Sequence, residues 1–213
     1  FSDAYDCKIN IPFDTLTFEE AINLYGTDKP DLRISETIFD ITDIFNETSI
    51  NFLNDILSSY GIIKALHTKE LLTRKQIDDL DIEIKELGSN GLGWFKIDET
   101  TISGPLSKLL SDQEKSKILS HGSGTLLFQA GKINDIAIYM DVIRRKVFQP
   151  SNNDVFSFVW IEDFPFFETE NGELQPSHHP FTSPKSNDVF KDDPINATAL
   201  HYDLVLNGVE LGS

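Results

Sequence analysis

The residues best placed for chemistry are two acids near the end of the chain, Asp203 and Glu210, which flank the pair Asn207-Gly208. An Asn-Gly pair favours a two-residue type I′ turn, because both central positions of that turn need a positive φ. We therefore expect a β-hairpin here. The predicted register places Leu206 opposite Val209, Val205 opposite Glu210 and Leu204 opposite Leu211.

Because side chains alternate across a pleated sheet, this hairpin would have an apolar face and an acidic face. Asp203, Val205 and Glu210 share the acidic face, where the two acids are diagonal neighbours about 7–8 Å apart. The apolar face, which we expect to be core, contains Leu204, Leu206, Val209 and Leu211.

Two carboxylates at that distance repel each other and raise one pKa unless a cation lies between them. Mg²⁺ suits such a pair, because it is usually held by one or two carboxylates together with substrate phosphates. The acidic face therefore has two interpretations, a metal–nucleotide site on an open sheet or a solvated outer face of a hairpin. On this stretch alone the solvated face is the preferred interpretation.

A second candidate is the pair His178-His179, which precedes Pro180. Adjacent side chains of an extended segment point to opposite faces, so at most one of the two faces a ligand directly. Neither has a second histidine at helical metal spacing, which argues against zinc. A structural role and a ligand loop both remain open, and a histidine on such a loop would suit an anionic substrate such as a carboxylate. His201 has the strand parity of Asp203, with charge balance at the surface as its preferred role.

Composition limits the class of protein. The chain has 213 residues, 39% hydrophobic and 25% charged, as expected for one or two soluble globular domains. Its net charge of −17 argues against a broad phosphate-binding surface, which needs clustered Lys and Arg. Cys7 is the single cysteine, which excludes an internal disulfide and a multi-cysteine zinc site. Without a membrane-length apolar run or a signal-peptide pattern, we expect a cytoplasmic location.

Local patterns predict alternating strands and helices over residues 61–148. Capping boxes at Thr17–Glu20 and Thr73–Gln76 start two helices, and the stripe from Ile133 to Val147 predicts a third. Residues 35–45 fit a strand or a helical turn. Expected strands are 61–67, 91–97, 125–129 and 156–161, and expected helices are 18–24, 73–87, 105–119 and 133–147.

Other conspicuous residues have simpler interpretations. The dense charges of Asp28, Lys29, Asp31 and Arg33 are read as a salt-linked surface loop. Trp94 and Trp160 lie on strands and are expected to be core. Arg144 and Arg145 fall off the apolar stripe, near a helix C-terminus, where cations are favoured.

Several motifs together resemble bacterial-type aspartyl-tRNA synthetase. The stretches that carry the resemblance are Thr17-Phe-Glu-Glu-Ala, Tyr25-Gly-Thr-Asp-Lys-Pro-Asp-Leu-Arg33, Leu72-Thr-Arg-Lys-Gln-Ile77, Gly91-Leu-Gly-Trp-Phe-Lys96, Phe158-Val-Trp-Ile-Glu-Asp-Phe-Pro165, His178-His-Pro-Phe-Thr-Ser-Pro184 and Tyr202-Asp-Leu-Val-Leu-Asn-Gly-Val-Glu-Leu-Gly212. They occur in the family's order over nearly the whole chain. The resemblance implies an α+β fold: part of a class II antiparallel sheet (1–34 and 151–213) with an inserted α/β GAD domain (35–150).

The family activates L-aspartate with ATP to aspartyl-adenylate and transfers it to tRNA. The resemblance implies that His178 and His179 belong to the aspartate-binding loop, and that Asp203 and Glu210 hold ATP through Mg²⁺. It also implies a homodimeric full-length enzyme. The anticodon-binding domain and the arginine-bearing motifs are expected outside residues 1–213, so this piece should be inactive alone. The alternative is a non-catalytic GAD-type module that binds tRNA or a partner protein, which would not need His178-His179 or the acidic pair.

Overall fold

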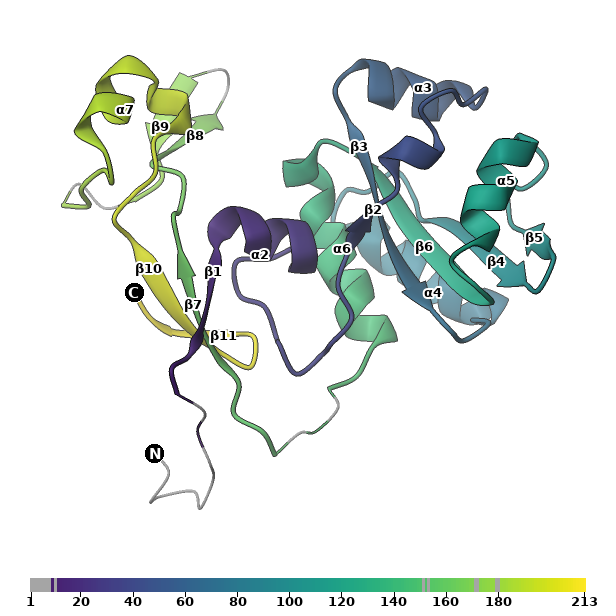
Figure 1. Cartoon of the computed structure of the whole chain (residues 1–213), viewed down its shortest axis with the longest axis horizontal. Helices are drawn as coiled ribbons and strands as arrows, with labels where there is room; N and C mark the ends of the chain where they lie inside the picture. Colours follow the sequence, from purple (N-terminus) through teal and green to yellow (C-terminus); the bar gives the residue numbers. More distant parts are fainter. Residues whose placement is uncertain (1–8, 10, 151, 153, 171–172, 179–180) are drawn as a thin grey trace. The chain divides into compact units, whose positions relative to one another are not determined.

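The structure is a computed structural model that describes residues 9, 11–150, 152, 154–170, 173–178 and 181–213. The chain contacts divide it into two units. The first contains Phe1–Ile22, Thr27–Ser35 and Pro150–Ser213, and the second contains Asn23–Gly26 and Glu36–Gln149. The predicted α+β class is confirmed, with mostly antiparallel sheets and helices packed against them (Figure 1).

A four-stranded sheet in the order β1-β7-β10-β11 forms the first unit. Its strands are Asp14–Thr17, Phe158–Glu162, Tyr202–Leu206 and Val209–Gly212. Strand β1 is parallel to β7, and the other pairs are antiparallel. The rest of this unit contains the hairpin β8–β9 (Phe167–Glu170 and Glu173–Pro176), helix α7 (Asn187–Asp192) and the 3₁₀ turn η2 (Pro194–Asn196).

Helix α2 (Phe18–Tyr25) begins at the predicted capping box. Thr17 Oγ1 accepts a hydrogen bond from the Glu20 N–H, and the Glu20 carboxylate accepts one from the Thr17 N–H. Gly26, with φ of 77°, follows the last turn. The box fixes where the helix starts, and with it the position of Ala21 against the sheet.

The predicted hairpin between β10 and β11 is confirmed, including its turn, because Asn207 and Gly208 have φ of 51° and 84°. Its register follows the prediction at Leu206 and Val205 but then shifts, so that Leu204 faces Gly212. An extra residue in β11, Leu211, produces this bulge. A turn sequence fixes the pairs next to it, whereas a bulge further along depends on the whole sheet.

The expectation about which hairpin face is core was wrong. Val205, on the acidic face, is fully buried against Ala21 of α2, Val159 and Phe164. Val209, on the expected core face, is 62% exposed. Strand alternation tells which side chains share a face, but not which face a helix will cover, and α2 covers the face that bears the acids.

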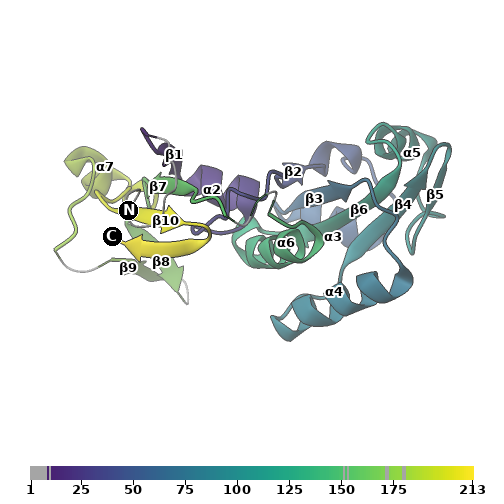
Figure 2. The same ribbon diagram turned by 90° about the horizontal axis from the view of Figure 1, so that it is seen from below.

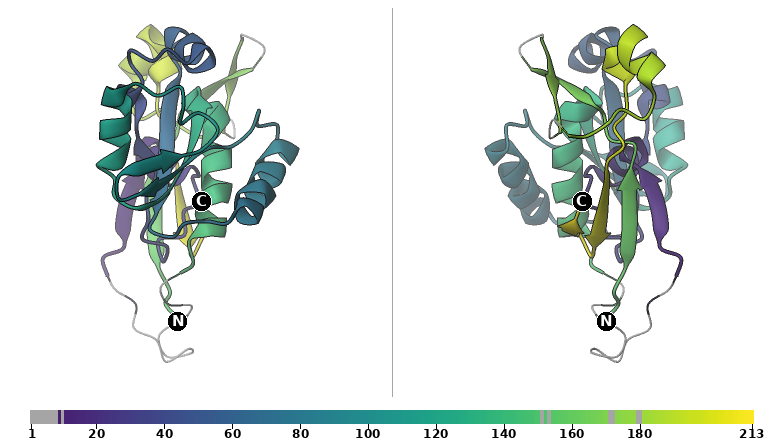
Figure 3. Two further views of the ribbon diagram at one scale, coloured as in Figure 1. Left: turned by 90° about the vertical axis from the view of Figure 1, so that its right-hand side faces the viewer. Right: turned by 90° about the vertical axis from the view of Figure 1, so that its left-hand side faces the viewer.

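The second unit is a five-stranded antiparallel sheet in the order β2-β3-β6-β4-β5. The strands are Phe39–Asp40, Ile62–Thr68, Gly124–Gly131, Gly93–Asp98 and Thr101–Ser103. Helices α4 (Arg74–Glu86) and α6 (Ile133–Val147) contact each other on one side of the sheet, and α5 (Asp112–Leu119) lies on the other (Figure 3). Figure 2 shows β3, β6 and β4, the three inner strands of this sheet, side by side.

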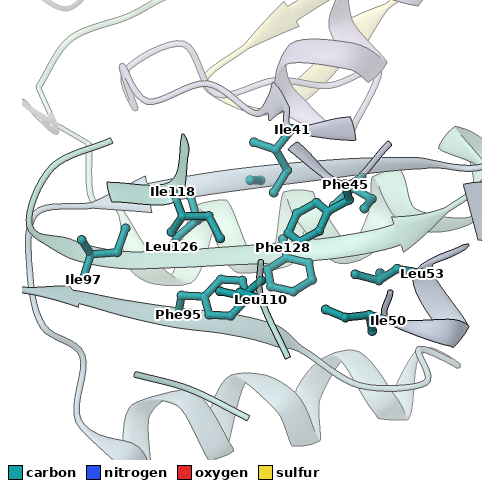
Figure 4. Close-up of a cluster of buried hydrophobic side chains, with 12 residues drawn as sticks. Ile41, Phe45, Ile50, Leu53, Phe95, Ile97, Leu110, Ile118, Leu126 and Phe128 are labelled. Atoms are coloured by element: carbon teal, nitrogen blue, oxygen red, sulfur yellow. The ribbon is translucent and has the colours of Figure 1, made fainter. Parts of the chain in front are cut away.

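Alternate residues of β6 pack into the hydrophobic core of this unit. Phe128 and Leu126 pack with Phe95 of β4 and with Leu53 of helix α3 (Asn51–Ser58), all with almost no exposed surface (Figure 4). The rings of Phe95 and Phe128 stack at 5.4 Å. This continuous core explains why the second unit holds together as one body.

Two expectations for the second unit needed correction. The helix expected over 105–119 begins only at Asp112, because Ser111 and Glu114 form a third capping box that stops any earlier start. Residues 35–45 form both expected structures in turn, the short strand β2 and then the 3₁₀ turn η1 (Thr42–Ile44). The apolar pattern alone did not show where one gives way to the other.

Arg144 falls off the apolar stripe of α6, as the sequence indicated, yet it has no exposed area. Its Nε donates to the Glu36 carbonyl over 2.6 Å, and its guanidinium lies 4.8 Å from the centroid of the Tyr25 ring. Arg145, the next residue, remains outside and pairs with Asp141. Trp94 and Trp160 are only partly buried, so neither is the core residue expected. None of the helices described is long and apolar enough to cross a membrane.

Candidate functional site

A cavity of about 210 Å³ lies in the first unit, beside β10. Its polar side chains come from four stretches that are far apart in sequence but meet next to the buried face of the sheet. The described residues that line it are Phe18, Asp28, Phe164, Pro165, Glu168, Ser177, His178, His201 and Asp203. None of these is a lysine or an arginine.

Two histidines form one wall of this cavity. The rings of His178 and His201 lie 4.4 Å apart, and the Phe164 ring meets both edge-on. His178 Nε2 lies 3.1 Å from the Pro165 carbonyl, which fixes the ring. Burial, and next the neighbouring His201, lower the pKa of His178 below its usual 6.5. His178 is therefore held in place mainly in its neutral form.

Asp203, next to His201, adds an acidic side chain to the lining and is only 4% exposed. His201 Nε2 lies 3.0 Å from Asp203 Oδ1, within ion-pair distance, but Oδ1 accepts no hydrogen bond. Burial, followed by the charge of Glu210, raises the pKa of Asp203 above 3.8. One oxygen of this buried carboxylate has no hydrogen bond and the charge of Glu210 acts against its ionised form, so a cation would stabilise it.

Glu210 lies on the same face of the hairpin as Asp203, since it pairs with Val205. Its carboxylate is 2.9 Å from the Lys29 ammonium, and this hydrogen bond raises the pKa of Lys29. The loop that carries Lys29 is anchored by Asp31, whose carboxylate binds the Arg33 guanidinium through two nitrogens. A lysine therefore neutralises Glu210, whereas the deeper Asp203 has His201 beside it, which is a cation only when protonated.

The carboxylates of Asp203 and Glu210, one of which has a buried oxygen without a hydrogen bond, fit a divalent cation such as Mg²⁺. No group of three or more His, Cys, Asp or Glu side chains in the described part of the chain could hold a metal by itself. Asp203 and Glu210 could therefore supply only part of a coordination shell. This suits Mg²⁺, which keeps waters and shares its ligands with substrate phosphates.

Of the site residues predicted from sequence, His178 and Asp203 line one cavity. Glu210 does not line it, but lies on the same hairpin face as Asp203. His179 lies outside the described residues. Sequence reasoning missed Asp28 and Glu168 as lining residues and assigned Lys29 to a salt-linked surface loop. Asp31 and Arg33 do pair within that loop, but Lys29 pairs with Glu210 instead. The density of charge in this turn was the available signal.

Comparison with known proteins agrees with this arrangement. Residues 2–213 match the family model of the class II tRNA synthetases (D, K and N). The chain is 36% identical to the aspartate–tRNA(Asp/Asn) ligases of Hydrogenobaculum sp. and of Caldanaerobacter subterraneus subsp. tengcongensis, over its whole length. It is 34% identical to the aspartate–tRNA ligase of Shouchella clausii, over 99% of its length.

The chain spans only part of those relatives, covering 40%, 38% and 38% of their lengths. The family match, however, extends over almost every residue and includes both the acidic hairpin and the histidine wall. The chain therefore belongs to the class II tRNA synthetases of the D, K and N group.

Proposed function

We propose that this chain is the part of an aspartate–tRNA ligase that binds L-aspartate and the metal-bound phosphates of ATP. The full protein would condense L-aspartate with ATP to aspartyl-adenylate and then esterify tRNA. The observation that carries the proposal is the cavity that His178, His201 and Asp203 line together, with Glu210 on the same hairpin face as Asp203. The aspartate–tRNA ligase names of the similar proteins support the choice of amino acid.

The cavity offers a polar partner to each kind of charged group on L-aspartate. The substrate has one ammonium and two carboxylates, and the lining offers the carboxylates of Asp28 and Glu168 to the ammonium. The imidazoles of His178 and His201 can donate hydrogen bonds to a substrate carboxylate, since a neutral imidazole has one N–H. In this proposal, His178 and His179 belong to the aspartate-binding loop.

ATP would bind next to the amino acid, with Mg²⁺ held by Asp203 and Glu210. The ion would neutralise phosphate charge while the amino-acid carboxylate attacks the α-phosphate and pyrophosphate leaves. The cation would also relieve the repulsion that raises the pKa of Asp203. Lys29 is placed to release Glu210 to the metal and to turn toward a phosphate, because more than a third of its side chain is exposed.

The remaining assignments are part of the same proposal. Residues 35–150 are the inserted GAD domain, and the full-length enzyme is a cytoplasmic homodimer that binds most of its tRNA through other regions. The 213-residue chain alone should not catalyse the reaction, because no Lys or Arg among the described residues lines the cavity to hold the phosphates.

The test is aspartate-dependent ATP–pyrophosphate exchange by the full-length protein. Glu210→Gln should lower the exchange rate by at least about 100-fold, the effect of losing one preorganised electrostatic partner of the transition state. The matched control is Glu173→Gln, on the exposed strand β9. Equal exchange by the Glu210 variant and the wild type would refute the metal assignment. Aspartylation of the aspartate and asparagine tRNAs, measured side by side, defines the tRNA specificity.

A further inference from the structure

A second hollow, of about 1010 Å³, lies within the second unit and has no part in the proposed reaction. It opens where the segment before β4 leaves the sheet, next to the end of β6. Gln129, Ala130 and Gly131 of β6 form its floor. Its walls include the exposed ring of Phe52 on α3, together with Leu106 and Tyr139.

The strand register leaves one edge of β6 open at this hollow. Strand β3 pairs with β6 along its whole length, ending at Ile62 opposite Gly131. Strand β4, on the other side, pairs with β6 only as far as Gly93 opposite Phe128. In the described part of the chain, therefore, no strand pairs with residues 129–131 on the β4 side.

The hydrogen-bonding direction of this open edge follows from the neighbouring strands. The Ile63 carbonyl of β3 accepts a hydrogen bond from the Ile41 N–H, so the backbone N–H and C=O of Ile63 point away from β6. Backbone groups of successive residues point to opposite sides of a strand. The N–H and C=O of Lys64 therefore point toward β6, where Lys64 pairs with Gln129. The backbone N–H and C=O of Gln129 therefore face β3, and those of Ala130 point the other way, into the hollow.

Side chains hold the chain away from the position that would fill this edge. Gly91 would face Ala130 if β4 continued, but its carbonyl accepts from Gln129 Nε2 over 2.9 Å and its N–H donates to Ser89 Oγ over 3.1 Å. The N–H of Leu92 donates to the Asp81 carboxylate over 2.8 Å. These three bonds satisfy the diverted backbone, so the groove is built into the fold and does not result from fraying.

We propose that this edge is a strand-addition site for an extended, basic segment of a partner protein. An added strand would run antiparallel to β6, and one of its residues would exchange both backbone hydrogen bonds with Ala130, as in β-augmentation. Alternate side chains would pack on Phe52 and Leu106. This inference is independent of the proposed aminoacylation site.

Charge selects the class of partner. Asp55 and Asp135, both exposed, line the hollow together with Asp81, whose carboxylate is paired with Lys85. Two carboxylates beyond that ion pair favour Lys or Arg side chains on the bound segment. They oppose nucleic acid, whose phosphates would meet net negative charge here. A peptide of alternating apolar and basic residues is the occupant that both the edge and the charges fit.

The test is NMR titration of the ¹⁵N-labelled chain with acetyl-Val-Lys-Val-Lys-Val-amide. The expected result is a shift of the Ala130 and Gly131 amide resonances and slower exchange of the Ala130 amide proton with solvent. A peptide N-methylated at its central residue should bind about 5–10-fold more weakly, since one backbone hydrogen bond is lost. The glutamate analogue, acetyl-Val-Glu-Val-Glu-Val-amide, should bind more weakly still.

Charge variants provide the matched comparison. The double variant Asp55→Asn, Asp135→Asn should weaken binding of the lysine peptide several-fold, and Asp79→Asn, an exposed change on α4 outside the hollow, should not. Retained dispersion of the amide spectrum shows that each variant is folded. The proposal is overturned if millimolar lysine peptide leaves Ala130 unshifted, or if the N-methylated peptide binds equally well. It is also overturned if the same resonances change on dilution without peptide, because a second copy would then occupy the edge.

Discussion

Replacing Asp203 by asparagine should make the first unit more stable at neutral pH, although it removes a residue that we assign to the metal site. Asp203 is 4% exposed, and its Oδ1 has no hydrogen bond. A buried group left unsatisfied costs about 1–3 kcal/mol, and more when it is charged. Asparagine keeps the shape, removes the repulsion by Glu210 and adds an amide N–H. We therefore expect Asp203→Asn to raise the free energy of unfolding by about 1–3 kcal/mol at pH 7.5.

The pH dependence provides an internal check on this reasoning. Burial and Glu210 raise the pKa of Asp203 above 3.8 in the folded protein. A carboxyl whose pKa is raised destabilises the fold at every pH above the raised value, and the penalty disappears as the pH falls below 3.8. The advantage of Asp203→Asn should therefore be full at pH 7.5 and should shrink to nearly zero in acid.

Urea unfolding followed by tryptophan fluorescence measures the effect. A Trp94→Phe background leaves Trp160, which lies on β7 opposite Leu204 of β10, as the reporter of the first unit. Asp154→Asn, at an exposed position of the same unit, is the charge-matched control and should change stability by less than about 0.5 kcal/mol. If Asp203→Asn is instead less stable than the wild type at pH 7.5, then His201 already pairs with Asp203, and the case for a missing cation fails.

Three further predictions concern the second unit. Arg144→Ala should cost about 3–5 kcal/mol, from a lost charged hydrogen bond and a desolvated cation–π contact. Arg145→Ala removes a half-exposed partner of the buried Asp141 carboxylate and should cost less, about 1–3 kcal/mol. Equal urea midpoints for the Arg144 and Arg145 variants would contradict the burial of Arg144. Ser111→Ala should cost about 1 kcal/mol through its cap, and an unchanged thermal midpoint would contradict it. The pKa values of His67 and His121, lowered mainly by burial, should lie below 6.5 in an NMR titration, and unfolding should become easier as the pH falls through that range.

Local patterns predicted much of this structure because their causes are local. A capping box needs only four residues, so the starts of α2 and α4 could be read directly. The long apolar stripe of α6 fixed both of its ends. The box at Ser111 was equally readable and was overlooked in favour of a longer apolar run. That Asp203 and Glu210 share one face of a hairpin was predicted in the same way, from a turn and strand parity.

Contacts between distant segments could not be read from any local pattern. Val205 is core because α2, more than 180 positions earlier, covers that face. Arg144 is buried because the Glu36 carbonyl and the Tyr25 ring accept its guanidinium. His201 became part of the site only when β10 brought it next to His178.

The sequence by itself determined the order of the main elements over residues 61–148, the acidic turn and the family resemblance, since these depend on residue type and spacing along the chain. Only the tertiary structure decided which hairpin face is buried, that Lys29 pairs with Glu210, and that β6 keeps an open edge at Ala130. Those outcomes depend on which segments meet in space. Whether a residue is buried or paired depends on a second segment as well as its own, and the local sequence does not specify that second segment.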